Sequence, residues 1–380
     1  MSLRALLPRR VLTPNGFESG RAVLLDGGMI LQVLPARDCP IEAERRELDG
    51  DLLPGFIDLQ VNGGGGVLFN VEPTVDGIAA IARAHRRFGT TGLLPTLISD
   101  DLDVVARAIA AVDDAIERRV PGILGIHIEG PFLNPARKGI HDAGKFRLLD
   151  EQAIEVLSSL KRGRTLVTLA PELAPPGAVR ALTERGIVVA AGHTDATFEQ
   201  VSSALDEGLA GFTHLYNAMT QLGSRAPGAV GAALSDEGSW CGLIVDGHHV
   251  HPAALRVALR AKGAEKLALV TDAMPTVGSE VKEFRLGGRR IVAQDGRCTD
   301  AAGTLAGSDL DMASAVRNAE TMMGVDFATA ARMASESPAR AIGRADSRGS
   351  IVAGAHADFV LMDSGRRVVE TWIGGAAERT

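Results

Sequence analysis

The chain has 380 residues, 46% of them hydrophobic, which is enough material for one large domain and a smaller one. A formal net charge of −7 argues against broad nucleic-acid binding, and the widely spaced Cys39, Cys241 and Cys298 form no CxxC metal site. The first residues lack the apolar centre of a signal peptide, and no segment approaches the ~20 apolar residues of a membrane span, so we expect a cytoplasmic protein.

The two chain ends share one pattern, because both are strand-like and punctuated by turns. We expect residues 1–50 and 346–380 to form the two halves of one small β domain. A barrel covering residues 51–345 is then inserted between them, with crossings near Asp49 and Ile342.

Eight short apolar runs follow between Asp51 and Ala273, each ending in polar residues. In chain order they are LLPGFIDLQVN, GLLPTLIS, GILGIHIEG, TLVTLAPE, IVVAAGHT, AGFTHLYN, CGLIVDG and LALVTDA. Apolar residues spaced at three and four predict helices between most of them, at 75–88, 101–118, 150–161, 198–207 and 252–261. Alternating strands and helices imply a parallel sheet, and eight units close a (β/α)8 TIM barrel with its chemistry at the carboxyl ends of the strands.

Three segments depart from the alternation. TQLGSRAPGAVGAALSDEG, after the sixth run, predicts a long loop with at most a short helix. Residues 281–300 alternate around Gly-containing turns and predict an inserted β hairpin. Helical patterns return at 310–323 and 327–335.

Acid and imidazole groups follow three of the predicted strands. Glu129, His193 and His214 come at the ends of the third, fifth and sixth runs, which barrel closure brings to one mouth. Each alone is more often an ordinary polar residue at a loop start. Together, one carboxylate and two imidazoles form a credible zinc set that leaves a position open for water.

Two further residues near this mouth have competing interpretations. His127 lies on the same side of its strand as Glu129 but deeper, so we favour a packed or supporting histidine over a fourth ligand. Asp272 ends the eighth run, where it can accept a proton from water held by the metal; a turn or helix-cap aspartate is the alternative.

The motifs across nearly the whole chain resemble one family. GIHIEGPFLNPARKGIHD, AGHTDAT, THLYNAM, RAPGAVGAA and LVTDAM are similar to the N-acetylglucosamine-6-phosphate deacetylases of the amidohydrolase superfamily. This resemblance implies a barrel beside a small β-sandwich domain, a divalent metal, and hydrolysis of the acetamide of N-acetylglucosamine 6-phosphate to glucosamine 6-phosphate and acetate. It also implies a role in amino-sugar catabolism or cell-wall sugar recycling.

The resemblance also assigns residues to roles. It makes Glu129, His193 and His214 the metal ligands and Asp272 the base that later protonates the leaving amine. It further implies that His141 contacts the sugar and polarises the acetyl carbonyl, and that Leu305 and Ala306 close over the acetyl group.

Gln60 and Asn62 occupy positions where many members of the superfamily carry His-x-His and bind a second metal. Neutral amides are weak ligands for Zn²⁺, so we expect one ion per subunit. Zn²⁺ is the expected ion, although Fe²⁺, Mn²⁺ and Co²⁺ can use the same ligands. Ordinary hydrogen bonding at the strand end, with both amides lining the site, remains open.

Phosphate recognition in an acidic protein needs local positive groups, for which Arg225 and His249 are candidates. The resemblance supports both and adds the backbone N–H groups of Asn217 and Ala218. It also implies that Arg225 reaches across from a neighbouring subunit, and hence a homodimer.

Two alternatives to this function stay open. One is an amidohydrolase acting on another N-acetyl amino sugar, including the galactosamine or mannosamine epimers, or on a cyclic amide. The other is a non-catalytic barrel that serves as a scaffold. His85 and His356 are expected to be surface residues without a role in any of these.

Overall fold

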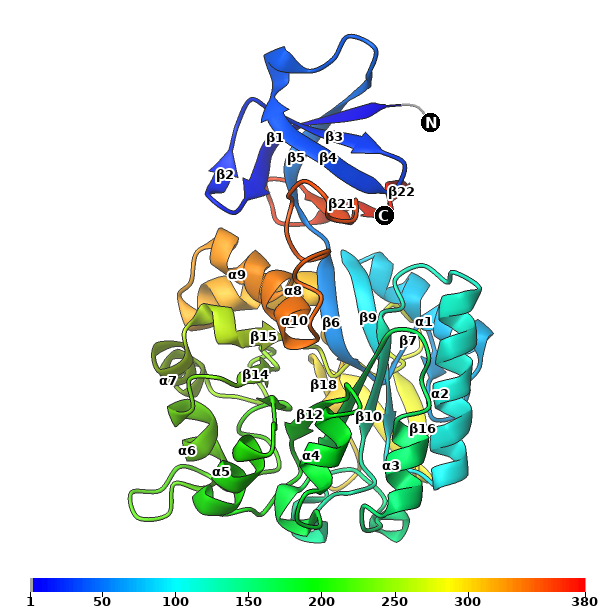
Figure 1. The fold of residues 1–380 in the computed structure, drawn as a ribbon, viewed down its shortest axis with the longest axis vertical. Coiled ribbons are helices and arrows are strands. Elements are labelled where there is room, and N and C mark those ends of the chain that lie inside the picture. Colours follow the sequence, from blue (N-terminus) through cyan, green and yellow to red (C-terminus); the bar gives the residue numbers. More distant parts are fainter. Residues whose placement is uncertain (1–2, 380) are drawn as a thin grey trace.

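The computed structural model describes residues 3–379 and places a large barrel domain below a smaller β domain (Figure 1). Eight parallel strands form the barrel sheet, and their spatial order is their chain order. They are β6 (Phe56–Val61), β9 (Thr90–Ile98), β10 (Gly125–Glu129), β11 (Arg164–Leu169), β12 (Val188–Ala191), β13 (Gly211–Phe212), β14 (Trp240–Leu243) and β15 (Leu267–Leu269). Each coincides with one of the eight apolar runs to within two residues at its start, so the predicted (β/α)8 TIM barrel is confirmed.

Helices cover the barrel sheet, and most present an apolar stripe to it and a polar face to solvent, whereas α6 is apolar and buried over most of its length. The helices that follow barrel strands are α1 (Val75–Arg86), α2 (Leu102–Glu117), α3 (Glu151–Leu157), α4 (Ala178–Thr183), α5 (Phe198–Asp206), α6 (Gly228–Ser235) and α7 (Pro252–Lys262). Side-chain caps begin several of them, as where the Thr74 hydroxyl accepts from the Gly77 N–H at 3.1 Å. The five expected helices are present, although α3 ends at Leu157, four residues before its pattern does, and α6 is the short helix of the long loop. No helix within residues 3–379 is long and apolar enough to cross a bilayer.

The eighth barrel strand is followed by a small antiparallel sheet of four strands. These are β16 (Glu283–Leu286), β17 (Arg289–Gln294), β18 (Arg297–Thr299) and β19 (Leu305–Ser308). The first two form the hairpin expected near 281–300, and the other two return the chain to the barrel mouth. Three helices then complete the barrel domain, namely α8 (Met312–Asn318), α9 (Phe327–Met333) and α10 (Glu336–Ala341).

Both chain ends contribute to the sheet of the small domain. Its strands are β1 (Arg4–Thr13), β2 (Gly16–Glu18), β3 (Arg21–Asp26), β4 (Met29–Pro35), β5 (Glu44–Pro54), β20 (Phe359–Met362), β21 (Val368–Ile373) and β22 (Ala376–Arg379). The ends meet where β5 pairs antiparallel with β20, with Pro54 opposite Phe359. Alternating residues of β1 enter two different apolar clusters, Ala5 on one face and Leu6 on the other. The domain boundaries near residues 50 and 345 stay predictions.

His85 was expected at the surface, and this prediction is wrong. Its side chain is fully buried on the inner face of α1, in the apolar stripe with Ile78 and Ile81. The His85 Nε2–H donates to the Gly63 carbonyl oxygen at 2.9 Å, and burial lowers the pKa of this imidazole. Gly63 begins β7 (Gly63–Gly64), which a tight turn at Gly65 and Gly66 connects to β8 (Val67–Leu68). His356 is half-buried rather than exposed.

Gly125, at the start of β10, allows close contact with the neighbouring strand. At its φ of +156° an added Cβ would lie 1.9 Å from the Arg164 carbonyl oxygen. Gly125→Ala is therefore expected to destabilise the protein by about 3 kcal/mol or more, seen as a lower thermal midpoint. Gly177→Ala is the matched control, because Gly177 has φ +80° but open space around it; only backbone strain of about 1 kcal/mol applies there. Equal losses for the two variants would show that the contact at Gly125 is readily relieved.

Candidate active site

A cavity of about 500 Å³ lies at the carboxyl ends of the barrel strands. Because β6 begins where β5 leaves the small domain, these ends point away from that domain (Figure 1). Most of the predicted site residues line the cavity, namely Glu129, His141, His193, His214, Asn217, Ala218, His249, Asp272 and Leu305. The barrel therefore gathers residues that are separated by up to 176 positions in the chain (305 − 129).

Glu129, His193 and His214 converge on one point and are all buried. Glu129 Oε1 lies 2.9 Å from His214 Nε2 and 3.3 Å from His193 Nε2, and the two Nε2 atoms are 3.1 Å apart. Burial alone would raise the pKa of Glu129, but its contacts with His193 and His214 lower that pKa well below the ordinary value. These three residues form the one group in the described chain with the geometry of a metal-ligand cluster.

The hydrogen bonds of His193 show that this cluster fits a cation. His193 Nδ1 lies 2.8 Å from the Arg137 carbonyl oxygen, which can only accept, so Nδ1 carries the proton. His193 Nε2 therefore presents a lone pair toward His214 Nε2 and the Glu129 carboxylate. Lone pairs that converge in a buried space need a positive charge between them, and this donor set suits a divalent metal with an open position for water.

Several residues around the cavity have strained backbones. Positive φ angles occur at His193 (+49°), His214 (+32°), Tyr216 (+78°), Ala218 (+49°) and Asp272 (+52°). Only three other non-glycine residues among the described ones share this property, and they lie elsewhere in the chain. Such conformations are costly and concentrate where function requires a particular side-chain direction.

Asp272 follows β15 and lines the same cavity as the metal-ligand cluster. Its side chain is half-buried in the cavity wall, where desolvation together with the negative charge of Glu129 raises the pKa of its carboxyl group to about 7. A carboxylate with a pKa near neutrality can both accept and return a proton, as a general base that later acts as an acid must do.

Gln60 and Asn62 lie beneath the cavity and do not line it. The Gln60 amide nitrogen donates to Glu129 Oε2 at 3.0 Å and to Asp272 Oδ1 at 3.1 Å, and the Asn62 amide nitrogen donates to the same Asp272 oxygen at 2.6 Å. Both amides therefore hold carboxylates, at positions where two histidines would instead offer ligands to a second metal.

His141 is oriented by Ser99, a residue that sequence reasoning missed. The Ser99 hydroxyl lies 2.8 Å from His141 Nδ1, and the Ser99 backbone N–H also points at Nδ1 at 3.4 Å. Because a backbone N–H can only donate, Nδ1 accepts and Nε2 carries the proton. Burial and the neighbouring His193 lower the pKa of His141 to about 3, so the ring is neutral and offers a single N–H donor.

His127 lies below the ligands and contacts two buried threonines. Its Nε2 is 2.8 Å from the Thr168 hydroxyl and its Nδ1 is 3.4 Å from the Thr96 hydroxyl. Burial lowers the pKa of His127 to about 4. This environment fits the packed, supporting histidine favoured by the sequence.

His249 lines the other side of the cavity and is oriented by Asp246, a second residue that sequence reasoning missed. Asp246 Oδ2 lies 2.6 Å from His249 Nδ1, which leaves Nε2 for the cavity. The Asn217 backbone N–H already donates to the His214 carbonyl oxygen at 3.0 Å. Of the two backbone N–H groups implied for phosphate binding, that of Ala218 therefore remains available to a ligand.

Arg225 and Ala306 are not brought into the cavity of the single chain. Arg225 is exposed and lines a separate cavity of about 370 Å³ beside α5, next to Gln221 and Phe198. Ala306 is fully buried behind Leu305 in β19, whereas Leu305 and Gly307 line the cavity.

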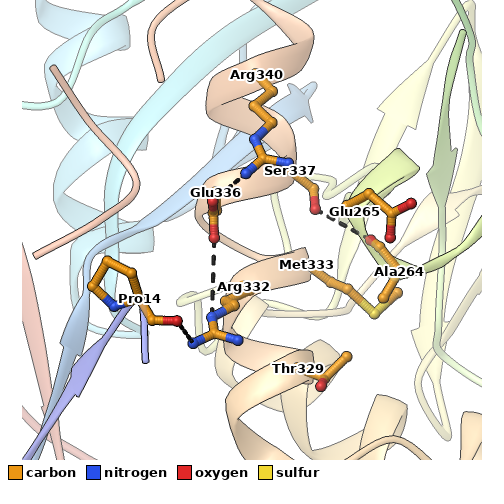
Figure 2. A pocket seen from close by; sticks show the side chains of 9 residues that line it. All are labelled: Pro14, Ala264, Glu265, Thr329, Arg332, Met333, Glu336, Ser337 and Arg340. Carbon is orange, nitrogen blue, oxygen red and sulfur yellow. Dashed lines mark hydrogen bonds and ion pairs between the residues drawn. The ribbon is translucent and has the colours of Figure 1, made fainter. Parts of the chain in front are cut away.

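A third cavity, of about 310 Å³, lies at the opposite end of the barrel, where α9 and α10 meet the small domain (Figure 2). Glu336 pairs with both Arg332 and Arg340, and Arg332 donates to the Pro14 carbonyl oxygen at 3.0 Å. The two ion pairs lie within the barrel domain, and the bond from Arg332 to Pro14 joins it to the small domain. The reactive groups lie at the cavity lined by Glu129 and Asp272.

The chain matches a known protein family and is similar to named proteins along nearly all of its length. The model of the Amidohydrolase family matches residues 52–377. The N-acetylgalactosamine-6-phosphate deacetylase of Shewanella sp. (strain ANA-3) is 42% identical, over 96% of this chain and 93% of that protein. The human N-acetylglucosamine-6-phosphate deacetylase is 38% identical, over 92% of this chain and 89% of that protein.

A solved structure agrees with these relatives. It is an aspartate-to-alanine mutant of N-acetyl-D-glucosamine-6-phosphate deacetylase from Mycobacterium smegmatis, in complex with N-acetyl-D-glucosamine-6-phosphate. Its TM-score to this chain is 0.92 at 32% identity, and all of both chains is covered.

Proposed function

The chain belongs to the amidohydrolase family and, within it, to the deacetylases of N-acetylated amino sugar phosphates, and on that premise we propose that it hydrolyses the acetamide of N-acetylglucosamine 6-phosphate. The observation that carries the proposal is the buried cluster of Glu129, His193 and His214 facing Asp272 across one cavity. The products are glucosamine 6-phosphate and acetate.

The metal centre follows from the donor set. Glu129 and the Nε2 atoms of His193 and His214 would hold one divalent ion, for which we propose Zn²⁺, with Fe²⁺, Mn²⁺ or Co²⁺ able to replace it. When bound, the ion supplies Lewis-acid activation of water and of the acetyl carbonyl. Gln60 and Asn62 are engaged with Glu129 and Asp272, which supports a single ion per subunit.

The remaining chemistry is carried by side chains of the chain itself. Asp272 accepts the proton of the attacking water as the new carbon–oxygen bond forms. The His141 Nε2–H donates to the acetyl oxygen as negative charge develops there. Asp272 then returns the proton to the nitrogen as the carbon–nitrogen bond breaks, so the amine leaves neutral.

The phosphate group needs donors at the far side of the cavity. We propose His249 Nε2 and the Ala218 N–H for this role, with Arg225 supplied by a second copy of the chain. Arg225 is exposed and lies outside the active-site cavity of its own chain, which supports that arrangement and the homodimer it requires. We also propose a cytoplasmic location, which the three buried, unpaired cysteines favour.

A second candidate substrate is N-acetylgalactosamine 6-phosphate, because a 42%-identical relative is named for it. The two sugars share the phosphate and the acetamide, so the same metal centre and base serve both. The direct test is acetate release from both phosphorylated epimers and from unphosphorylated N-acetylglucosamine, with metal content measured on the same sample. Release from a phosphorylated sugar alone, with about one metal per chain, supports the proposal. Equal release from the unphosphorylated sugar contradicts the phosphate site, and none from any sugar contradicts the function.

Arg225→Ala is expected to raise KM for the phosphorylated sugar about 10- to 100-fold and leave unphosphorylated turnover unchanged, because a charge-assisted contact to phosphate is lost. Arg37→Ala, a change at an exposed arginine of the small domain, is the control. A mixture of Arg225→Ala and Asp272→Asn chains then tests the shared site. If Arg225 acts in trans, one of the two sites in each mixed dimer is intact. Random pairing of equal amounts of the two chains therefore restores about one quarter of all sites. Unrestored activity in proven mixed dimers would place Arg225 in its own subunit's site.

A further inference from the structure

The barrel closes between β6 and the segment after β15 with almost no strand pairing. The barrel sheet runs from β15 round to β6, and within the described residues the two ends are joined by a single backbone bridge, between Val61 and Ala273. The Asn62 and Gly63 N–H groups both donate to the Ala273 carbonyl oxygen, at 2.9 and 3.0 Å, and side-chain hydrogen bonds add to these few backbone contacts. This junction directly adjoins Asp272.

Asp58, in the middle of β6, accepts two of these side-chain bonds, both from Thr271. Its side chain is fully buried and does not line the cavity. Asp58 Oδ2 accepts from the Thr271 hydroxyl at 2.6 Å, and Oδ1 accepts from the Thr271 N–H at 3.3 Å and the Gln60 N–H at 3.2 Å. Burial raises the pKa of Asp58 to about 7, so placing this carboxyl in the barrel core opposes its ionisation. Because Asp58 is buried away from the cavity, its role must lie in the residues that it contacts.

The partner of Asp58 fixes the backbone on both sides of Asp272. The Thr271 hydroxyl, which donates to Asp58, also accepts from the Ala273 N–H at 3.2 Å. Ser308 completes the enclosure, since its hydroxyl donates to the Thr271 carbonyl oxygen at 2.5 Å and its N–H to the Asp272 carbonyl oxygen at 2.9 Å. Asp272 is thereby held at φ +52°, a conformation that an unconstrained aspartate seldom adopts.

Asp58 also acts on the side chain of Asp272. The Gln60 peptide N–H is bound by Asp58, and the Gln60 amide donates to Asp272 Oδ1 and Glu129 Oε2. One carboxyl group thus orients both the backbone that presents the base and the amide that directs its carboxylate toward the metal ligands.

We propose that Asp58, acting through Thr271, is a positioning residue that holds Asp272 in its strained, catalytically competent conformation. This inference rests on the proposed function, in which Asp272 transfers the proton. It assigns to Asp58 no contact with substrate or metal.

Thr271→Val is the sharpest test, because valine keeps the size and branching of threonine and removes only the hydroxyl. We expect kcat to fall about 10- to 100-fold, with KM and bound metal changed less than about threefold, since misplacing a reacting group affects turnover rather than binding. Thr271→Ser keeps the hydroxyl and is expected to retain most turnover. Asp58→Asn, which loses an acceptor for the Thr271 hydroxyl, is expected to act in the same direction as Thr271→Val.

Thr91→Val is the matched control. Thr91 is also buried and its hydroxyl donates to the Phe56 carbonyl oxygen at 3.3 Å, at the end of the β6–β9 pair away from the cavity. This variant is expected to keep its kcat. In addition, Thr271→Val should reduce turnover no further in an Asp272→Asn background, because the residue it positions is already disabled. A further loss there, or unchanged kcat in Thr271→Val alone, would overturn the proposal.

A crystal structure of Thr271→Val separates this proposal from the proposed function. Asp272 displaced from its left-handed conformation supports the positioning role whether or not the enzyme acts on amino sugar phosphates. Asp272 unmoved would overturn it. Wild-type protein that releases no acetate from any of the sugars would overturn the proposed function and leave the structural result to decide on Asp58.

Discussion

Asp272→Asn is expected to lower kcat about 10²- to 10⁴-fold while KM and metal content stay nearly constant. Asparagine has the shape of aspartate and can still accept the hydrogen bonds of Gln60 and Asn62, so the site should remain assembled. It cannot take a proton from water or deliver one to the leaving amine. The measurement is steady-state acetate release, with metal content determined on the same protein.

The pH dependence provides a second readout of the same residue. In the metal-free protein burial and Glu129 raise the pKa of Asp272 to about 7, and a bound cation nearby would lower it. Because the base must be ionised, turnover should rise as pH increases through the pKa of Asp272, and this acid limb should be absent from the residual activity of Asp272→Asn. Asp103→Asn, at an exposed aspartate of α2, is the control. A fully active Asp272→Asn enzyme would contradict the assigned role.

Glu129→Gln is expected to weaken binding of the divalent ion by at least about 100-fold and to abolish most turnover at limiting metal. Glutamine removes the only negative charge of the ligand set, and its NH₂ group would face the lone pairs of His193 and His214. Calorimetric titration of metal-free protein with Zn²⁺ measures the affinity directly and does not depend on activity.

The control for this change is Glu283→Gln, in the exposed hairpin, which should bind the ion like the wild type. Thermal stabilisation by added Zn²⁺ should likewise be lost in Glu129→Gln and kept in the control, since a ligand stabilises only the state that binds it. Unaltered Zn²⁺ affinity in Glu129→Gln would show that the ion is held elsewhere.

The barrel could be predicted because its signals are local. A strand buried on both faces must be a short apolar run, and β9 shows this plainly, as all nine of its residues are buried. Helix limits were less certain, because they depend on capping contacts; α3 ends at Leu157, where the Ser158 hydroxyl turns back to the Ile154 carbonyl oxygen.

His85 shows where local signals fail. A histidine near the end of an amphipathic helix looks like a surface residue, and only packing reveals that its ring fills the space beside Gly63 and Gly64 of β7. Ser99 and Asp246 were missed for a related reason. Ser99 orients His141, 42 residues away, and Asp246 orients His249, 3 residues away. Serine and aspartate are common at strand ends and turns, so neither stands out in the sequence.

The sequence by itself determined the order of the eight strands and the polar residues at their carboxyl ends, because periodicity and composition are written in consecutive residues. Tertiary structure alone decided which of these residues meet and how they are aimed. The contacts of Asp272 with Gln60 and Asn62, and the bond from Thr271 to Asp58, join segments about 200 residues apart, and Asp272 has a left-handed backbone where they meet. Such contacts depend on the closure of the barrel, since it is closure that brings β6 against the end of β15.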